Sequence, residues 1–205
     1  IHHGIVERGS KTTSDSYILW PAKIGAFTLV MGRHYKNTDT SDLPFSYLIE
    51  NKDDSWLAPA VNLQSVGTIR DVVKWPKRDR RKDSQKLDCI NFNLLSPFTI
   101  QKMLNGLEIL NNLKQVSGAT TDTYAYHSTL IKRPSLERGI DLYTKAVYKF
   151  LGNSLISRID KCRTNTFSEI IECLKPTNES GSGDWSDLAG LIAPQSEISK
   201  ILNDI

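Results

Sequence analysis

The stretch from Lys74 to Lys82 holds the densest positive charge in the chain. It combines six cations with the carboxylate of Asp79 and the indole of Trp75. Like charges packed this closely repel one another unless an anion or a set of carboxylates offsets them. Arginine guanidinium groups fork onto phosphates, and an indole stacks on a base. The side chains that we select from this run as an anion-binding set are Lys74, Trp75, Arg78, Arg80 and Arg81.

Two other interpretations of this basic run stay open. In the first, Arg78 and Arg81 pair with neighbouring aspartates, and the remaining cations form a solvated face. In the second, the run binds nucleic acid, with Trp75 stacking on a base. The net charge of the whole chain is only +3, which makes nucleic-acid binding the weakest of the three interpretations. Pro76 is expected to limit any helix here to the residues that follow it.

His34 is the candidate general base, because the pKa of an imidazole lies near the working pH of most enzymes. It stands in a Gly-Arg-His-Tyr-Lys segment, where Arg33 and Lys36 are suited to meet a phosphate or a carboxylate. A polar turn that leaves a strand is the other interpretation of this segment. No neighbour in sequence is placed to orient the imidazole, so a carboxylate between positions 39 and 50 would have to approach it in space.

The chain lacks other familiar catalytic and metal-binding patterns. It contains no HExxH, CxxC, GxSxG, P-loop or GxGxxG motif, so we expect no metal site, no serine triad and no nucleotide fingerprint. The odd count of three cysteines, at Cys89, Cys162 and Cys173, argues against a disulfide framework and predicts reduced thiols in a cytoplasmic protein. No apolar run approaches the roughly 20 residues that span a bilayer, so no membrane association is expected.

The elements that must position these residues change in character along the chain. Residues 1–95 contain short apolar runs punctuated by Gly, Pro and Asn-Asp clusters, which predicts short strands and long loops. Residues 96–176 have apolar side chains at helical spacing, and residues 177–205 have the composition of a linker followed by a docking C-terminal helix. The sequence therefore predicts three regions with these boundaries.

Start and stop signals locate the helices within the second and third regions. Ser96 with a following proline predicts a helix start, and Gly118 predicts its end. A second helix is expected from Ser135, with Gly152 kinking or dividing it. A capping box at Thr166 predicts a short third helix, and a proline at position 194 introduces the last one.

Ile18, Ile24 and Val30 lie six residues apart, the spacing of a hexapeptide repeat. Several further segments resemble the C-terminal half of a family of long, uncharacterised bacterial proteins that carry such repeats and are labelled as transferases. These segments are Leu19-Trp20-Pro21-Ala22, Phe27-Thr28-Leu29-Val30-Met31-Gly32, Asp42-Leu43-Pro44-Phe45-Ser46-Tyr47-Leu48, Lys74-Trp75 and Arg78-Asp79-Arg80-Arg81. The resemblance implies an α+β fold in which the N-terminal half forms the terminal coils of a left-handed parallel β-helix and packs against a helical C-terminal half.

Three functions follow from these observations and the resemblance. The first is a transferase of an acyl or related group that acts on a sugar or nucleotide-sugar, with His34 as base and acyl-coenzyme A as a candidate donor. The second is a non-catalytic module that forms homo-oligomers and binds a small anionic or sugar-phosphate ligand. The third is nucleic-acid binding through the basic run. Whether the chain is an enzyme stays open between the first two.

Overall fold

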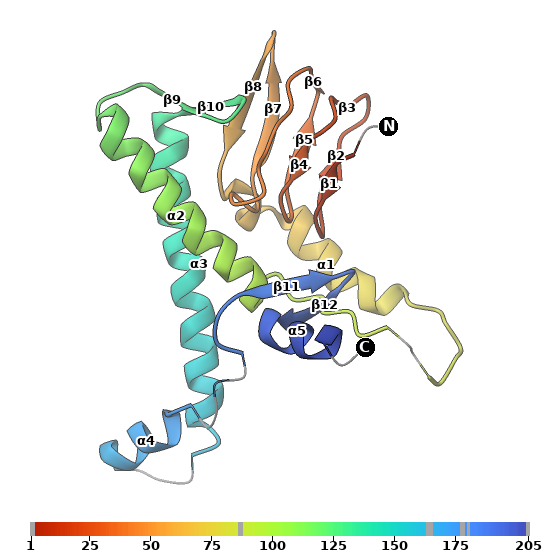
Figure 1. Ribbon diagram of the computed structural model, residues 1–205, viewed down its shortest axis with the longest axis vertical. Helices are drawn as coiled ribbons and strands as arrows, with labels where there is room; N and C mark the ends of the chain where they lie inside the picture. The colour runs from red at the N-terminus through yellow and green to blue at the C-terminus, as the bar shows by residue number, and fades with distance from the viewer. Residues whose placement is uncertain (1–2, 86–87, 163–165, 177–178, 180, 204–205) are drawn as a thin grey trace.

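The computed structural model describes residues 3–85, 88–162, 166–176, 179 and 181–203, and its fold is mixed α and β (Figure 1). The strands of the N-terminal half gather on one side, and two long helices, α2 (Pro97–Ser117) and α3 (Arg133–Ile159), run side by side along the other. A hairpin and a last helix from the C-terminal end lie near the first helix, α1 (Val66–Arg78), so the C-terminal end of the chain lies against its N-terminal half.

The first six strands are two or three residues long and pair in parallel. They are β1 (Ile5–Val6), β2 (Lys11–Thr12), β3 (Tyr17–Ile18), β4 (Lys23–Ile24), β5 (Leu29–Met31) and β6 (Arg33–His34). The strand β1 pairs with β4, β2 pairs with β5, and β3 pairs with β6. In register, Ile5 lies beside Lys23 and Lys11 lies beside Leu29. The chain therefore returns repeatedly to lie alongside its own earlier strands.

The largest sheet has six strands in the order β2-β5-β7-β8-β10-β9. Its later members are β7 (Tyr47–Asn51), β8 (Asp54–Ala58), β9 (Thr123–Tyr126) and β10 (Thr129–Lys132). The strand β5 pairs with β7 in parallel, but β7 and β8 form an antiparallel hairpin, as do β9 and β10. A parallel pair between β8 and β10 joins the two hairpins.

The prediction of the terminal coils of a left-handed parallel β-helix is wrong. The strands of the described residues are divided among four sheets, and the largest of these sheets mixes parallel and antiparallel pairs. The six-residue spacing does mark inward-facing aliphatic residues, because Ile24 and Val30 are buried and Ile18 is half-buried. Short parallel strands are enough to bury them, and the chain then reverses through Lys52, which has a φ of 57° between β7 and β8.

The helix α1 (Val66–Arg78) lies in a region where the sequence predicted strands and loops. It follows a 3₁₀ turn at Val61–Gln64. The expectation that Pro76 confines helix to later residues is also wrong, because the helix precedes this proline and includes it in its last turn. A proline so close to the C-terminal end removes one of the last intrahelical hydrogen bonds and leaves the turns before it intact.

The helices α2 (Pro97–Ser117) and α3 (Arg133–Ile159) were predicted from their apolar spacing, and both predictions are confirmed. Ser96 caps α2 in a reciprocal capping box with Thr99, and Gly118 follows its last turn. The predicted interruption at Gly152 is wrong, because α3 continues through it to Ile159. No other group lies within 4 Å of where its side chain would be, so this glycine serves no close packing.

The C-terminal elements are α4 (Phe167–Leu174), β11 (Trp185–Leu188), β12 (Leu191–Pro194) and α5 (Gln195–Asn203). The last helix begins directly after Pro194, as expected, and β11 and β12 form an antiparallel hairpin of their own. Residues 177–178 and 180 of the predicted linker lie outside the described residues.

The prediction that all three cysteines are reduced is wrong for two of them. Cys162 and Cys173 form a disulfide across a separation of 11 residues, with their Cα atoms 6.2 Å apart. The bond joins the segment after α3 to α4, and Cys89 stays a free, exposed thiol. The spacing of the two cysteines in the sequence did not predict this disulfide, because helix α4 folds back to α3 and only then brings the two side chains together.

One hydrophobic core joins the strands to the two long helices. Its largest fully buried side chains include Tyr124, Tyr143, Phe45, Ile24, Leu43, Leu48, Leu57, Met103, Leu110, Ile131 and Leu136. None of the helices in the described part of the chain combines the length and the apolarity that crossing a bilayer requires.

Candidate ligand-binding groove

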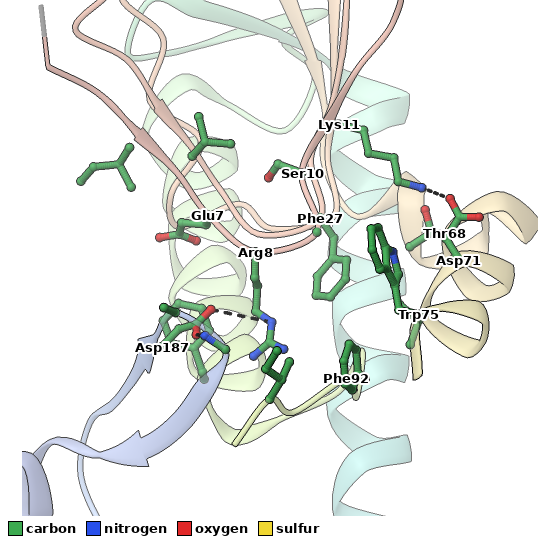
Figure 2. Close-up of a pocket in the computed structure, with 18 of the residues that line it drawn as sticks. Glu7, Arg8, Ser10, Lys11, Phe27, Thr68, Asp71, Trp75, Phe92 and Asp187 are labelled. Carbon is green, nitrogen blue, oxygen red and sulfur yellow. Dashed lines mark hydrogen bonds and ion pairs between the residues drawn. The ribbon is translucent and has the colours of Figure 1, made fainter. Parts of the chain in front are cut away.

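A groove of about 830 Å³ opens where four segments meet (Figure 2). Residues 5–11 of the N-terminal strands form one wall, and α1 forms another. The remaining walls come from the segment at Ile90 and Phe92 and from the hairpin of β11 and β12. A volume of this size falls within the range typical of small-molecule sites, which is roughly 300–1,000 Å³.

Aromatic side chains make up much of the groove surface. Phe27 has a φ of 56° and stacks on Phe45 at a ring-centroid distance of 4.6 Å, which fixes its ring at the base of the groove. Trp75 projects from α1 with 63% of its surface exposed, and Phe92, with 36% exposed, lies close to it in Figure 2. Neighbouring exposed rings can bind the planar or apolar part of a ligand.

Arg8 supplies the charge at the centre of this groove. Figure 2 shows its side chain between Asp187 and the rings of Phe27, Phe92 and Trp75. Only 11% of the side chain is exposed, and burial lowers the pKa of the guanidinium, an effect that Asp187 opposes. An arginine at this site nevertheless stays charged, because its ordinary pKa is far above neutrality.

The hydrogen bonds of Arg8 are incomplete. Its Nη2 donates to the carbonyl oxygen of Asn91, and its Nε lies 3.7 Å from Oδ2 of Asp187, too far for a hydrogen bond. Among the residues that the structure describes, neither Nε nor Nη1 has a hydrogen-bond acceptor, and both atoms are buried. Asp187 is itself held in place by the amide of Gly190, which donates to its Oδ1 at 2.7 Å. The guanidinium therefore keeps donor capacity that an anionic oxygen would satisfy.

The other charged side chains of the groove have partners within the protein. Glu7 forms an ion pair with Lys102 at 3.0 Å and accepts a hydrogen bond from the amide of Ala26 at 2.9 Å. Burial raises the pKa of Glu7, although Lys102 and the Ala26 amide act in the opposite direction. Lys11 pairs with Asp71 on α1. These pairs join the groove walls and leave Arg8 as the cation with buried, unused N–H groups in the described lining.

The predicted general base, His34, is not part of this groove. Its ring is fully buried, and its Nε2 donates to the carbonyl oxygen of Met31 at 3.2 Å. In the neutral ring, Nδ1 therefore accepts from the hydroxyl of Ser55, at 2.8 Å. Burial lowers the pKa of His34, whereas Met31 and Glu50 act to raise it. A role in catalysis stays a prediction, and it would require the ring to leave these two bonds.

The cations predicted to act with His34 are on the surface and are already paired. Arg33 forms two hydrogen bonds with the carboxylate of Asp15, at 2.7 and 2.8 Å. Lys36 pairs with Asp54 at 3.0 Å. Both pairs are exposed, so they contribute little to stability. The structure thus places these cations in two separate surface pairs outside the groove.

The predicted anion-binding run is largely a solvated face, and Trp75 is its one member among the described residues that line the groove. Arg81 is neutralised by Asp79 and Asp88, at 2.6 and 2.8 Å, as the structural interpretation of the run expected. Lys74, Arg78 and Arg80 are exposed at the end of α1 and just beyond it, with no carboxylate partner among the described residues. The run therefore contributes one aromatic side chain to the groove and no cation.

Sequence reasoning missed Arg8, Phe27, Phe92 and Asp187, which all line the groove. These residues lie up to 179 positions apart and share no motif. A glycine next to Arg8 marks a turn, with a φ of 66° at Gly9, but turns of this kind are common. Among the described residues, no group of three or more His, Cys, Asp or Glu side chains could hold a metal ion.

The buried histidine gives the protein a pH dependence that can be measured. The folded state holds the pKa of His34 below its ordinary value of 6.5. Above pH 6.5 the neutral ring therefore makes its full contribution to the free energy of unfolding, and this contribution is lost as the pH falls from 6.5 through the folded pKa. We expect a loss of up to about 1.4 kcal/mol in the free energy of unfolding between pH 7.5 and 5.5. Urea unfolding at both pH values measures it, and His34→Gln should remove this part of the difference. An equal loss in the variant would contradict the assignment.

Two family matches cover much of the chain. Residues 1–114 match the family described as "Domain of unknown function (DUF4954)", and residues 166–205 match the one described as "Domain of unknown function (DUF6819)". No curated protein and no solved structure matches the chain. Neither description names an activity, so the resemblance to hexapeptide-repeat transferases stays a prediction. Arg8 and Trp75 belong to the first matched segment and Asp187 to the second, so both segments contribute walls to the groove.

Proposed function

We propose that this chain, which belongs to the family described as "Domain of unknown function (DUF4954)", is a non-catalytic module that binds an anionic ligand in its groove. The observation that carries the proposal is the buried guanidinium of Arg8, whose Nη1 and Nε have no acceptor among the described residues. Buried donors without partners are costly, at about 1–3 kcal/mol each, so a ligand oxygen that accepts from them gains this energy on binding.

The surroundings of Arg8 restrict the ligand further. A charged oxygen at the guanidinium would stand beside the rings of Phe27, Phe92 and Trp75, which suit a planar or apolar body attached to the anion. Nucleotide-sugars and coenzyme A carry a phosphate and a base in one molecule, so both fit this description. The groove as a whole is not strongly basic, because Asp71, Asp187 and Glu7 balance its cations. Recognition therefore depends on one oriented guanidinium and the rings, and a diffuse positive field contributes little.

Transfer chemistry has weaker support in this fold. The proposed base, His34, is buried outside the groove and is engaged by Ser55 and Met31. Nucleic-acid binding through the basic run would be steeply salt-dependent, and of the run only Trp75, among the described residues, lines the groove. The cytoplasmic location also stays a prediction, since the disulfide of Cys162 and Cys173 is of a kind that persists mainly in oxidising compartments.

The proposal is tested by calorimetric titration with acetyl-coenzyme A, UDP-glucose and inorganic phosphate. We expect one of the two larger probes to bind, and Arg8→Met to weaken its affinity by about 10- to 100-fold, because the apolar stem is kept and the charged donors are lost. Trp75→Ala should weaken it about 5- to 100-fold through lost stacking. Phosphate alone should bind far more weakly, since it makes no contact with the rings.

A matched control lies on the helix that carries Trp75. Arg78 is an exposed cation of α1 that does not line the groove, so Arg78→Met should leave the affinity unchanged. An equal loss of affinity in Arg78→Met and Arg8→Met would mean that the ligand binds at the basic run, which would contradict the proposal. Absence of binding for all three probes at millimolar concentration would also overturn it.

A further inference from the structure

Arg8 and Asp187 lie beside each other in the groove, and each has hydrogen-bonding groups that the described residues leave unused (Figure 2). Nε and Nη1 of Arg8 are buried and lack an acceptor among those residues. Asp187 accepts from the amide of Gly190 through Oδ1, whereas no donor in the described part of the chain hydrogen-bonds its Oδ2, which lies 3.7 Å from Nε of Arg8. The groove therefore presents unused donors next to an unused acceptor.

This arrangement favours a ligand that carries both an anionic oxygen and a donor. A ligand with anionic oxygens alone would bring them to Arg8 and also close to the carboxylate of Asp187, which repels them. A hydroxyl next to the anionic oxygen removes the conflict, because it donates to Oδ2 while the anionic oxygen accepts from the guanidinium. Since Nε and Oδ2 are 3.7 Å apart, two ligand oxygens with a similar separation can reach both at ordinary hydrogen-bond lengths of about 2.7–3.0 Å.

The other charges of the groove limit the charge of the acid group. Lys11 is bound to Asp71, and Glu7 is bound to Lys102. Among the described lining residues, no further cation is left to balance a second negative charge next to Asp187. Each phosphate within the diphosphate of a nucleotide-sugar carries one charge, whereas a terminal phosphate such as that on the ribose of coenzyme A carries about 1.5 to 2 at neutral pH. A singly charged phosphate therefore fits this position better.

We infer that the ligand of the groove is a nucleotide-sugar whose sugar keeps a hydroxyl next to the carbon that bears the phosphate. An oxygen of this phosphate accepts from Arg8, and the neighbouring hydroxyl donates to Oδ2 of Asp187. The base lies against the rings of Phe27, Phe92 and Trp75. The inference rests on the proposed function, because it assigns a class of ligand to the same groove.

Two probes that differ by this one hydroxyl, UDP-glucose and UDP-2-deoxyglucose, test the inference by calorimetric titration. The wild type should bind UDP-glucose at least about tenfold more tightly, because the deoxy probe lacks the hydrogen bond to a charged group. In Asp187→Asn this ratio should fall to within about threefold. The amide of Gly190 requires an acceptor, so the side-chain oxygen of asparagine takes the place of Oδ1 and its NH₂ group takes the place of Oδ2. Relief of repulsion acts on both probes alike, so the ratio isolates the contribution of the hydroxyl.

Asp71→Asn is the matched control, because it removes the same charge from the groove lining and leaves Asp187 in place. The ratio between the two probes should keep its wild-type value. Equal affinities of the wild type for both probes, an unchanged ratio in Asp187→Asn, or the same fall in Asp71→Asn would overturn the inference. Binding of acetyl-coenzyme A without binding of UDP-glucose would do so too.

The response of Arg8→Met separates the failure of this inference from the failure of the proposed function. If Arg8→Met weakens the binding of a probe but the hydroxyl has no effect, the groove binds an anion and only the assignment of the ligand class is wrong. If no probe binds, or if Arg8→Met binds as tightly as the wild type, the proposed function and the inference are both wrong.

Discussion

Gly25→Ala is expected to lower the free energy of unfolding by at least about 3 kcal/mol. A Cβ atom at this position would collide with the carbonyl oxygen of Thr40, and it would lie 2.9 Å from the carbonyl carbon of Thr40 and 3.2 Å from the Cα of Ser41. All three are backbone atoms, so no side chain can rotate to make room. The amide of Gly25 also donates to Oγ1 of Thr40 at 2.8 Å, and the shift needed to relieve the clash would break this bond.

The same substitution in a helix provides the control. Gly152 lies within α3 with no other group near its missing side chain, so Gly152→Ala should stabilise the protein by up to about 1 kcal/mol through helix propensity. Urea unfolding followed by circular dichroism measures both variants. If Gly25→Ala costs less than about 1 kcal/mol, the close approach of the two backbones at Gly25 and Thr40 is wrong.

Tyr143→Ala should destabilise the protein by about 3–5 kcal/mol. The ring of Tyr143 is completely buried, between α3 and the strands, and its hydroxyl donates to the carbonyl oxygen of Pro44 at 2.5 Å. A Cβ at Gly106 of α2 would lie only 3.0 Å from Cε2 of this ring, so the ring also fixes the contact between the two long helices. Removing it opens a cavity that the packed backbones of α2 and α3 cannot fill.

Tyr143→Phe separates the two contributions of this residue. It keeps the ring and leaves the carbonyl of Pro44 without its partner, so we expect a loss of about 1–3 kcal/mol. Chemical denaturation of both variants gives the two values. Equal losses in Tyr143→Phe and Tyr143→Ala would mean that the hydrogen bond carries the whole effect, contrary to the packing argument.

The groove links the stability of this fold to its proposed function. Its walls come from both ends of the chain, and the pairs of Arg8 with Asp187 and of Lys11 with Asp71 connect those walls. The amide of Asn91 also donates to the carbonyl oxygen of Gly190 at 2.9 Å, which attaches the hairpin to the wall at residues 90–92. A ligand that binds Arg8 would contact all of these segments at once, so its binding should stabilise the docking of the C-terminal hairpin.

Local signals in the sequence were enough to locate the long helices. Ser96 and Gly118 bound α2 because a cap and a stop act on the backbone within a few residues of themselves. The spacing of Ile18, Ile24 and Val30 identified aliphatic positions that turn inward. It did not determine the architecture, because several arrangements of short parallel strands bury the same residues. The pairing of β8 with β10 also joins strands that lie far apart in the sequence.

The candidate groove could not be predicted from the sequence for a related reason. A dense run of cations such as Lys74 to Lys82 is conspicuous in sequence, but exposure leaves it solvated and partly paired with its own aspartates. Arg8 is one ordinary cation among many in the sequence. It becomes distinctive only when folding buries it beside Asp187 and leaves its N–H groups without acceptors. The sequence by itself determined the two long helices and the inward aliphatic residues, which depend on near neighbours. Burial and distant partners decide the chemistry of a charge, and they exist only in the tertiary structure.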